Sequence, residues 1–288
     1  MAGGAIRARL AKGPGCYAPA MPLLNTRGTA LWYQVTGTGV PLVLVHGSAV
    51  DGNTWNGVAV KLAQDHRVIT YDRRGYGRSV HKPVRDHRVH AQDLTDILEQ
   101  VAREPAVVVG WSSGGNVALA AAAQRPELCR SLVIVEAPFH GMRHMDAKVA
   151  RTLFRLKAQQ LRGHRVAALE EFLRFGSALR SGGNAYDGYG ALSRKILCRY
   201  PDQVLAEWDP HPFGVMHEHI PMKAITAMPV PITWLLGSES SPWLAGLHAR
   251  VVRHRPDIET VVVPGASHLM HLDQPAAFTD AVRSAARR

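Results

Sequence analysis

One serine stands in a setting that suits nucleophilic catalysis. Ser112 occupies the centre of Gly110-Trp111-Ser112-Ser113-Gly114, after an apolar run at residues 106–109 and before a helical pattern of small residues at 116–124. Glycines two positions either side of a serine, between a strand and a helix, permit a strained turn that projects the hydroxyl above a sheet. An ordinary strand-to-helix turn with an N-capping serine would contain similar residues, but the three-part context favours a nucleophile. We predict that Ser112 attacks a carbonyl carbon.

A serine hydroxyl is a weak nucleophile at neutral pH and needs a neighbouring base. The chain has 15 histidines, and most of them should be surface or packing residues. His268 differs because it follows the last predicted strand on a short loop and comes after the serine in chain order. His271 is the local competitor, but it lies deeper in the next segment. We predict that His268 is the general base.

The attacked carbonyl oxygen gains negative charge and needs N–H donors. An apolar run at residues 42–45 leads into His46-Gly47-Ser48, and this pattern predicts a strand followed by a loop. The backbone N–H of Ser48 could there join that of Ser113, which lies at the N-terminus of the helix after the serine turn. We predict Ser48 and Ser113 as the oxyanion donors.

The elements that must position these residues can be read from the alternation of patterns. From residue 29, short β-branched runs alternate with longer helical patterns, which is typical of an α/β fold with a mostly parallel sheet and helices on both faces. Strands are predicted at residues 30–35, 42–45, 68–71, 107–109, 132–135, 232–236 and 260–263, and we expect the later ones to be buried on both faces.

The regular alternation stops at Pro138 and resumes near Met228. We therefore predict a core at residues 21–138 and 228–288, and a helical cap inserted at residues 139–227. Residues 1–20 carry basic residues and no regular pattern, and we expect them to be a disordered extension.

Further motifs accompany the serine turn. They are His46-Gly47, Trp55, the stretch DRRGYGRS at residues 72–79, and Gly265-Ala266-Ser267-His268. With these motifs the chain resembles the α/β-hydrolase superfamily over about residues 25–138 and 228–288. The resemblance implies the α/β-hydrolase fold, with Ser112 as nucleophile, His268 as base, and the N–H groups of Ser48 and Ser113 as oxyanion donors. A narrower resemblance, to the zearalenone-lactonase-like branch, rests on residues 111–114, Glu136 before Ala137-Pro138, and Pro264-Gly265.

The acid that orients the histidine has two candidates. Most members of the superfamily place this acid after the penultimate core strand, where the present chain has only Glu239. A minority place it after the strand that follows the helix behind the nucleophile, where this chain has Glu136. Glu136 would lie beside the nucleophile strand, and between an apolar run and Pro138 it would be poorly hydrated without a partner. Glu239 lies among serines, where it can stay solvated. We predict Glu136 as the acid and keep Glu239 as the alternative; either could instead be structural.

The predicted cap is rich in aromatic and methionine side chains. Such residues form the cap's own core or line an apolar pocket, which suits a medium-sized hydrophobic ester or lactone. We expect Trp111 and Trp208 to contact substrate. The set comprises Phe154, Phe172, Phe175, Tyr186, Tyr189, Tyr200, Trp208, Phe213, Met142, Met145 and Met216.

These residues together predict a serine hydrolase that acts as an esterase or lactonase. A cofactor-free haloperoxidase or perhydrolase would use the same triad and stays open as an alternative. A non-catalytic ligand-binding protein on the same scaffold is disfavoured by the intact serine, histidine and acid. Epoxide hydrolases and dehalogenases attack with a carboxylate, so the serine disfavours them too.

Composition excludes several other classes. The formal net charge of +11 arises from scattered basic residues without a nucleic-acid-binding signature, so no nucleic-acid partner is expected. No apolar stretch reaches the roughly 18 residues of a membrane span, and the N-terminus lacks a secretory signal, so we expect no membrane partner. Three unrelated cysteines suit a reducing cytoplasm. No metal or nucleotide motif is present, so no cofactor is expected; a homodimer is left open.

Overall fold

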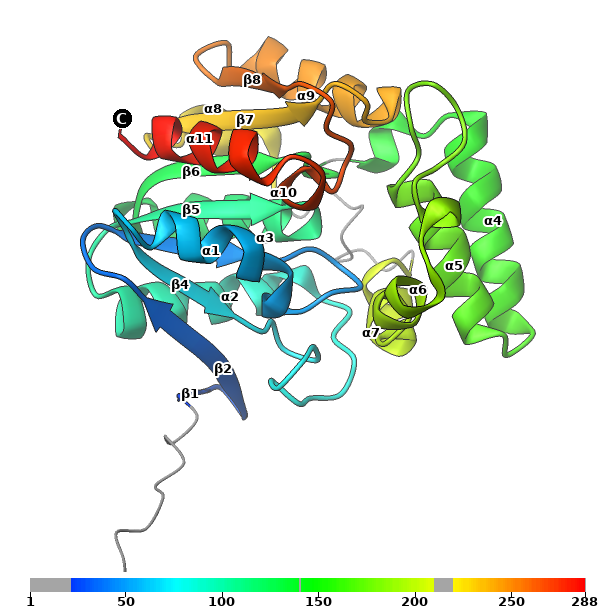
Figure 1. Cartoon of the computed structure of the whole chain (residues 1–288), viewed down its shortest axis with the longest axis horizontal. Helices are drawn as coiled ribbons and strands as arrows, with labels where there is room; N and C mark the ends of the chain where they lie inside the picture. Colours follow the sequence, from blue (N-terminus) through cyan, green and yellow to red (C-terminus); the bar gives the residue numbers. More distant parts are fainter. Residues whose placement is uncertain (1–21, 140, 210–219, 288) are drawn as a thin grey trace, which may run out of the picture.

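Eight strands form one sheet in the order β1-β2-β4-β3-β5-β6-β7-β8 (Figure 1). The computed structural model describes residues 22–139, 141–209 and 220–287. β1 and β2 pair antiparallel, β2 also pairs antiparallel with β4, and all the other pairings are parallel, which confirms the predicted α/β fold. The strands are β1 (Leu23–Thr26), β2 (Thr29–Thr36), β3 (Pro41–Val45), β4 (Arg67–Tyr71), β5 (Ala106–Trp111), β6 (Cys129–Val135), β7 (Ile232–Gly237) and β8 (Glu259–Val263).

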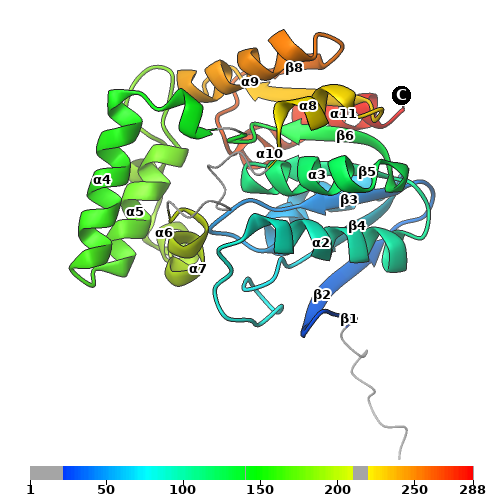
Figure 2. The same ribbon diagram turned by 180° about the vertical axis from the view of Figure 1, so that it is seen from behind.

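Helices cover both faces of the sheet (Figures 1 and 2). β5 shows why its sequence is apolar throughout: Val107 and Val109 pack into the core on one face, and Val108 packs into the core on the other. One face carries α1 (Asn56–Leu62), α10 (Met270–Asp273) and α11 (Pro275–Ala286). The other carries α2 (His87–Ile97), α3 (Ser113–Gln124), α8 (Met222–Ala227) and α9 (Pro242–His254). Short 3-10 or π turns lie at Gly52–Trp55, Leu98–Ala102, Pro126–Leu128, Gly141–His144 and Tyr186–Gly188.

A layer of helices between β6 and β7 stands over the end of the sheet where the parallel strands finish (Figure 1). It consists of α4 (Ala147–Leu161), α5 (Arg165–Gly176), α6 (Ala191–Leu197) and α7 (Pro201–Glu207). We call these four helices the cap. Its own apolar cluster includes Ala49 and Tyr76 of the core, so the cap is packed onto the sheet end. α8 also falls within residues 139–227, but it packs against α3.

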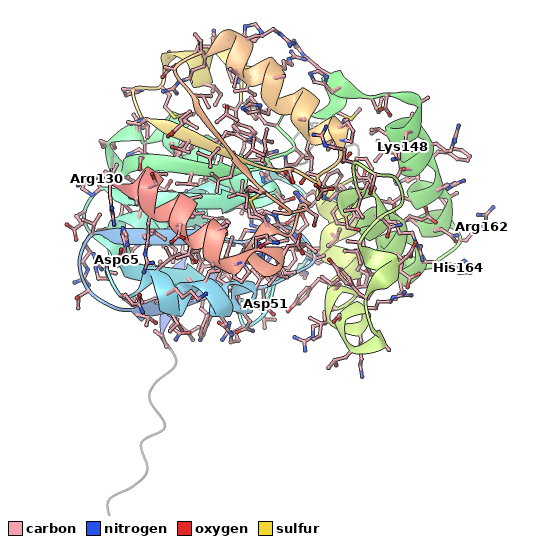
Figure 3. The ribbon with its side chains drawn as sticks, turned by 45° about the horizontal axis from the view of Figure 1, so that its top comes forward. Asp51, Asp65, Arg130, Lys148, Arg162 and His164 are labelled. Carbon is pink, nitrogen blue, oxygen red and sulfur yellow. The ribbon has the colours of Figure 1, made fainter. Side chains whose placement is uncertain are left out.

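Some basic residues of the cap region lie on its outer side. Figure 3 shows Lys148, Arg162 and His164 projecting away from the sheet, and all three are exposed. None of the helices within the described ranges is long and apolar enough to cross a bilayer.

The structure corrects some local expectations. β8 is not buried on both faces, because it is an edge strand whose Val262 is 55% exposed. β1 had no strong pattern of its own and is held by pairing with β2. The extension predicted at residues 1–20 lies outside the described residues.

The order of the strands creates a crevice at one edge of the sheet. β3 lies between β4 and β5, so the chain leaves β3 and β5 in opposite directions and a crevice opens at their carboxyl ends. The residues after β3, β5 and β6 are therefore neighbours, and they include Ser48, Ser112 and Glu136.

Candidate active site

The turn between β5 and α3 has the strained geometry expected of a nucleophile elbow. Ser112 has φ 54° and ψ −126°, a left-handed φ that is uncommon for a residue with a side chain. The flanking glycines are required by close approach. A Cβ on Gly110 would lie 2.6 Å from the carbonyl oxygen of Gly114, and a Cβ on Gly114 would lie 2.4 Å from that of Val45. Packing on both sides therefore holds Ser112 in its strained conformation.

His268 and Glu136 form a hydrogen-bonded pair. Nδ1 of His268 lies 2.7 Å from Oε2 of Glu136, and Oε1 of Glu136 accepts a hydrogen bond from the backbone N–H of Gly237 at 2.7 Å. A carboxylate can only accept, so Nδ1 carries the proton and Nε2 is left as an acceptor. Glu136 is 1% exposed and occupies a left-handed φ of 46° at the end of β6. This arrangement orients the imidazole as a general base requires.

Glu239 has a different setting. Its side chain is exposed and accepts a hydrogen bond from Ser238 Oγ at 2.9 Å. Its backbone N–H donates to the Ala266 carbonyl and its carbonyl accepts from the backbone N–H of Arg180, so the backbone of Glu239 stabilises the turn after β7. The structure brings Glu136 to His268 and leaves Glu239 in solvent.

His271 is a packing residue. Its Nε2 lies 2.8 Å from Thr54 Oγ1, and its ring lies 4.7 Å from the rings of both Trp55 and Trp111. Burial, with a smaller contribution from the neighbouring His268, lowers the pKa of His271 to about 3. The side chain is therefore neutral at physiological pH, and its partners are residues of the core.

The loop after β3 lies directly against the elbow. A Cβ on Gly47 would lie 3.0 Å from the Ser112 Cβ, so a larger residue there would have to displace the elbow by a few tenths of an ångström. His46 fixes the loop: its Nε2 accepts from the backbone N–H of Arg73 at 2.9 Å, which leaves Nδ1 to donate to the Gly47 carbonyl at 2.7 Å. Burial and the charge of Arg73 lower the pKa of His46 to about 4, which keeps this pattern in place at neutral pH.

The two predicted oxyanion donors are neighbours. The hydroxyls of Ser48 and Ser113 are 2.9 Å apart. Ser113 is the first residue of α3, so its backbone N–H has no acceptor within the helix. Their role as oxyanion donors stays a prediction.

A buried ionic cluster beneath this loop was not predicted. Glu207, at the end of the cap helix α7, accepts from Ser48 Oγ at 2.6 Å and pairs with Arg73 at 3.1 Å. Both charged side chains are fully buried. Burial alone would raise the pKa of Glu207, but the charge of Arg73 and a smaller contribution from the neighbouring His90 outweigh it and hold that pKa well below its usual range. His90 Nε2 lies 3.3 Å from Glu207 Oε1.

Above the serine the cap and core line a small cavity of about 60 Å³. Ser112 and His268 line it together with aromatic side chains of the cap. Trp208 forms part of the wall and packs on Phe172 at 4.7 Å. Trp111 also reaches the cavity, and its indole N–H donates to the His268 carbonyl at 2.7 Å, so it supports the histidine loop as well.

Other aromatic residues of the cap divide between pocket and surface. Phe175, Tyr186 and Tyr189 line the cavity, whereas Phe154 is 74% exposed and Met145 is also exposed. Phe213 and Met216 lie outside the described residues. Within the described ranges, no group of three or more His, Cys, Asp or Glu side chains is placed to hold a metal ion.

The comparison that decides the family covers most of the chain. The model of the alpha/beta hydrolase family matches residues 42–281. The chain belongs to the alpha/beta hydrolase family. The predicted α/β-hydrolase is thereby confirmed as to family and fold, and the narrower likeness to the zearalenone-lactonase-like branch stays a prediction.

Relatives of this alpha/beta hydrolase cover most of its length. The sn-1-specific diacylglycerol lipase ABHD11 of Mus musculus is 27% identical over 84% of this chain and 80% of its own. Esterase YbfF of Escherichia coli is 27% identical over 84% of this chain and 91% of its own. A solved structure described as Est816, an N-acyl homoserine lactone degrading enzyme, is 21% identical with a TM-score of 0.76, over 91% of this chain and 99% of that one. This last likeness shows the fold.

Proposed function

We propose that this alpha/beta hydrolase cleaves an ester or lactone bond of a medium-sized hydrophobic substrate through an acyl-enzyme on Ser112. The observation that carries the proposal is that a serine on a strained elbow and a histidine hydrogen-bonded to a buried glutamate line the same cavity. The relatives named as an esterase and a diacylglycerol lipase support an ester as the bond that is cleaved.

In the proposed reaction, Ser112 Oγ attacks the carbonyl carbon and its proton passes to Nε2 of His268. The carbonyl oxygen gains negative charge, which the backbone N–H groups of Ser48 and Ser113 stabilise. Glu136 stabilises the imidazolium that forms. His268 then returns the proton to the leaving alcohol oxygen, and the carbonyl re-forms as the acyl-enzyme.

Water completes the cycle. His268 takes a proton from a water molecule, whose oxygen attacks the acyl carbon. Collapse of the second tetrahedral intermediate breaks the bond to Ser112 Oγ, which takes back the proton, and releases the carboxylic acid. If peroxide replaced water in this step, the product would be a peracid, which is the perhydrolase alternative.

Labelling with a fluorophosphonate, followed by peptide mapping, tests the proposal. We expect the label on Ser112, and hydrolysis of some members of a panel of p-nitrophenyl esters and aromatic or macrocyclic lactones. Ser241→Ala is a matched control for labelling because Ser241 lines the same cavity, and this variant should still be labelled on Ser112. Label on Ser241, or turnover that survives Ser112→Ala, would contradict the proposal. Faster acyl transfer to hydrogen peroxide than to water would favour the alternative.

A further inference from the structure

The cavity over Ser112 is too small for a medium-sized substrate. Its volume of about 60 Å³ lies well below the roughly 300–1,000 Å³ of typical small-molecule sites. A second hollow of about 480 Å³ lies beside it, between the cap helix α6 and the core segments around η1 (Gly52–Trp55) and α10. We call this hollow the side groove. It is large enough for the part of a substrate that the cavity cannot hold.

The cavity and the side groove share a wall. Val50 and Leu269 from the core and Tyr189 and Leu197 from the cap line both of them. The shared residues are apolar or aromatic, so a hydrocarbon chain lying against this wall would leave no buried polar group unpaired. Figure 3 labels Asp51, which lines the side groove, where the core faces the cap.

The shared wall adjoins the loop that carries His268. Leu269 directly follows His268, the residue that protonates the departing alcohol in the proposed mechanism. Trp208 lines the cavity but not the side groove, and it stands against the oxyanion loop, with its indole nitrogen 3.4 Å from Ser48 Oγ. In the proposed mechanism, the alcohol that His268 protonates thus departs next to residues that border the side groove, whereas Trp208 beside the oxyanion loop borders only the cavity.

The chemistry of the side groove favours a neutral, apolar occupant. Ile196 and Leu272 expose 43% and 55% of their surface there. The lining also holds two carboxylates and one guanidinium, Asp51, Asp273 and Arg199. Both carboxylates already accept hydrogen bonds, Asp51 from Tyr200 and Asp273 from Ser267, and Arg199 lies 4.0 Å from Asp51. With two carboxylates to one guanidinium the lining has a surplus of negative charge, which disfavours an anionic alcohol.

We propose that the side groove binds the alcohol portion of the substrate, and that the substrates are esters of a short acyl group with an extended, neutral, apolar alcohol. This inference rests on the proposed ester hydrolysis at Ser112. Each methylene of the alcohol that enters the groove should raise kcat/KM by about two- to fourfold.

Two series of substrates test the inference. Alkyl acetates from methyl to octyl vary the alcohol, and ethyl esters from acetate to octanoate vary the acyl group. We compare the whole protein with Ile196→Glu and Leu272→Glu. The matched control is Leu192→Glu, because Leu192 is on the same helix as Ile196 and is 72% exposed but does not line the groove.

We expect kcat/KM of the unaltered protein to rise along the acetate series. In both groove variants octyl acetate should lose at least about tenfold, while methyl acetate stays unchanged, and the control should behave like the unaltered protein. A rise along the acyl series with a flat acetate series would overturn the inference, as would an equal loss in the Leu192→Glu control. If the protein hydrolysed no ester at all, the proposed function itself would be wrong.

Discussion

Replacing Glu207 with glutamine removes one charge of a fully buried pair while keeping the shape of the side chain. Arg73 would then be left with little compensation. Its Nη2 contacts only Glu207 and Ser113 Oγ, and its Nε and Nη1 have no hydrogen-bond partner in the part of the chain that the structure describes. The guanidinium would remain charged and buried without a counter-charge.

The expected loss is large compared with the stability of a domain. Breaking a buried ion pair by removing one partner costs about 3–5 kcal/mol, against a total free energy of unfolding of about 5–15 kcal/mol. Urea unfolding followed by circular dichroism should show the midpoint of Glu207→Gln lowered by more than about 1 M. The double variant Arg73→Met with Glu207→Met should lose less stability than Arg73→Met alone or Glu207→Met alone, because no charge is then left buried.

The same helix provides the control. Asp202, in the first turn of α7, pairs with Arg165 at 2.8 Å, and both side chains are more than half exposed. Asp202→Asn should therefore cost less than about 1 kcal/mol. A Glu207→Gln variant no less stable than Asp202→Asn would refute the reasoning, and so would additive losses in the double variant. Because Glu207 also holds Ser48, kcat of Glu207→Gln should fall as well.

Three other predictions follow from the site. Ser112→Ala should lower kcat by about 10⁶ without a change in the urea midpoint, and residual turnover near that of the unaltered protein would exclude Ser112 as nucleophile. Glu136→Gln should lower kcat by about 10⁴ at saturating substrate while Glu239→Gln stays near normal; the reverse result would move the acid to Glu239. His271 and His46 have folded-state pKa values of about 3 and about 4, below the unfolded value of about 6.5, so only the unfolded chain binds these protons as the pH falls through that window. Stability should therefore decrease from pH 6.5 towards pH 4 by about 1.4 kcal/mol per pH unit for each histidine, and urea titrations of His271→Gln should show a shallower dependence; an unchanged slope would contradict the assignment.

The parts of the site that follow directly from strands were predictable from the sequence. The elbow depends on short-range contacts. A Cβ on Gly110 would clash with residues a few positions along the chain, and a Cβ on Gly114 would clash with the end of the neighbouring strand. The position of Glu136 could also be predicted, because its place at the end of a strand next to β5 follows from the order of the elements. In each case a short motif and a rule of parallel sheets were enough.

The ionic cluster could not be predicted in the same way. Arg73 and Glu207 are 134 residues apart, and Glu207 lies on a cap helix whose sequence carries no repeating motif. An arginine in a loop and a glutamate on a helix usually indicate solvated surface. Only the docking of α7 onto the core places both of them out of solvent.

This docking also bears on how a substrate reaches Ser112. Swinging α7 away from the core would separate Glu207 from Arg73, at a cost comparable to breaking the pair by mutation. It would also remove the Ser48 hydrogen bond to Glu207. The contacts between α6 and α10 are different, because the side groove already separates these elements and leaves Ile196 and Leu272 exposed. If the side groove binds the alcohol as proposed, we therefore expect the substrate to enter from the side groove, because that route disturbs the fewest buried charges.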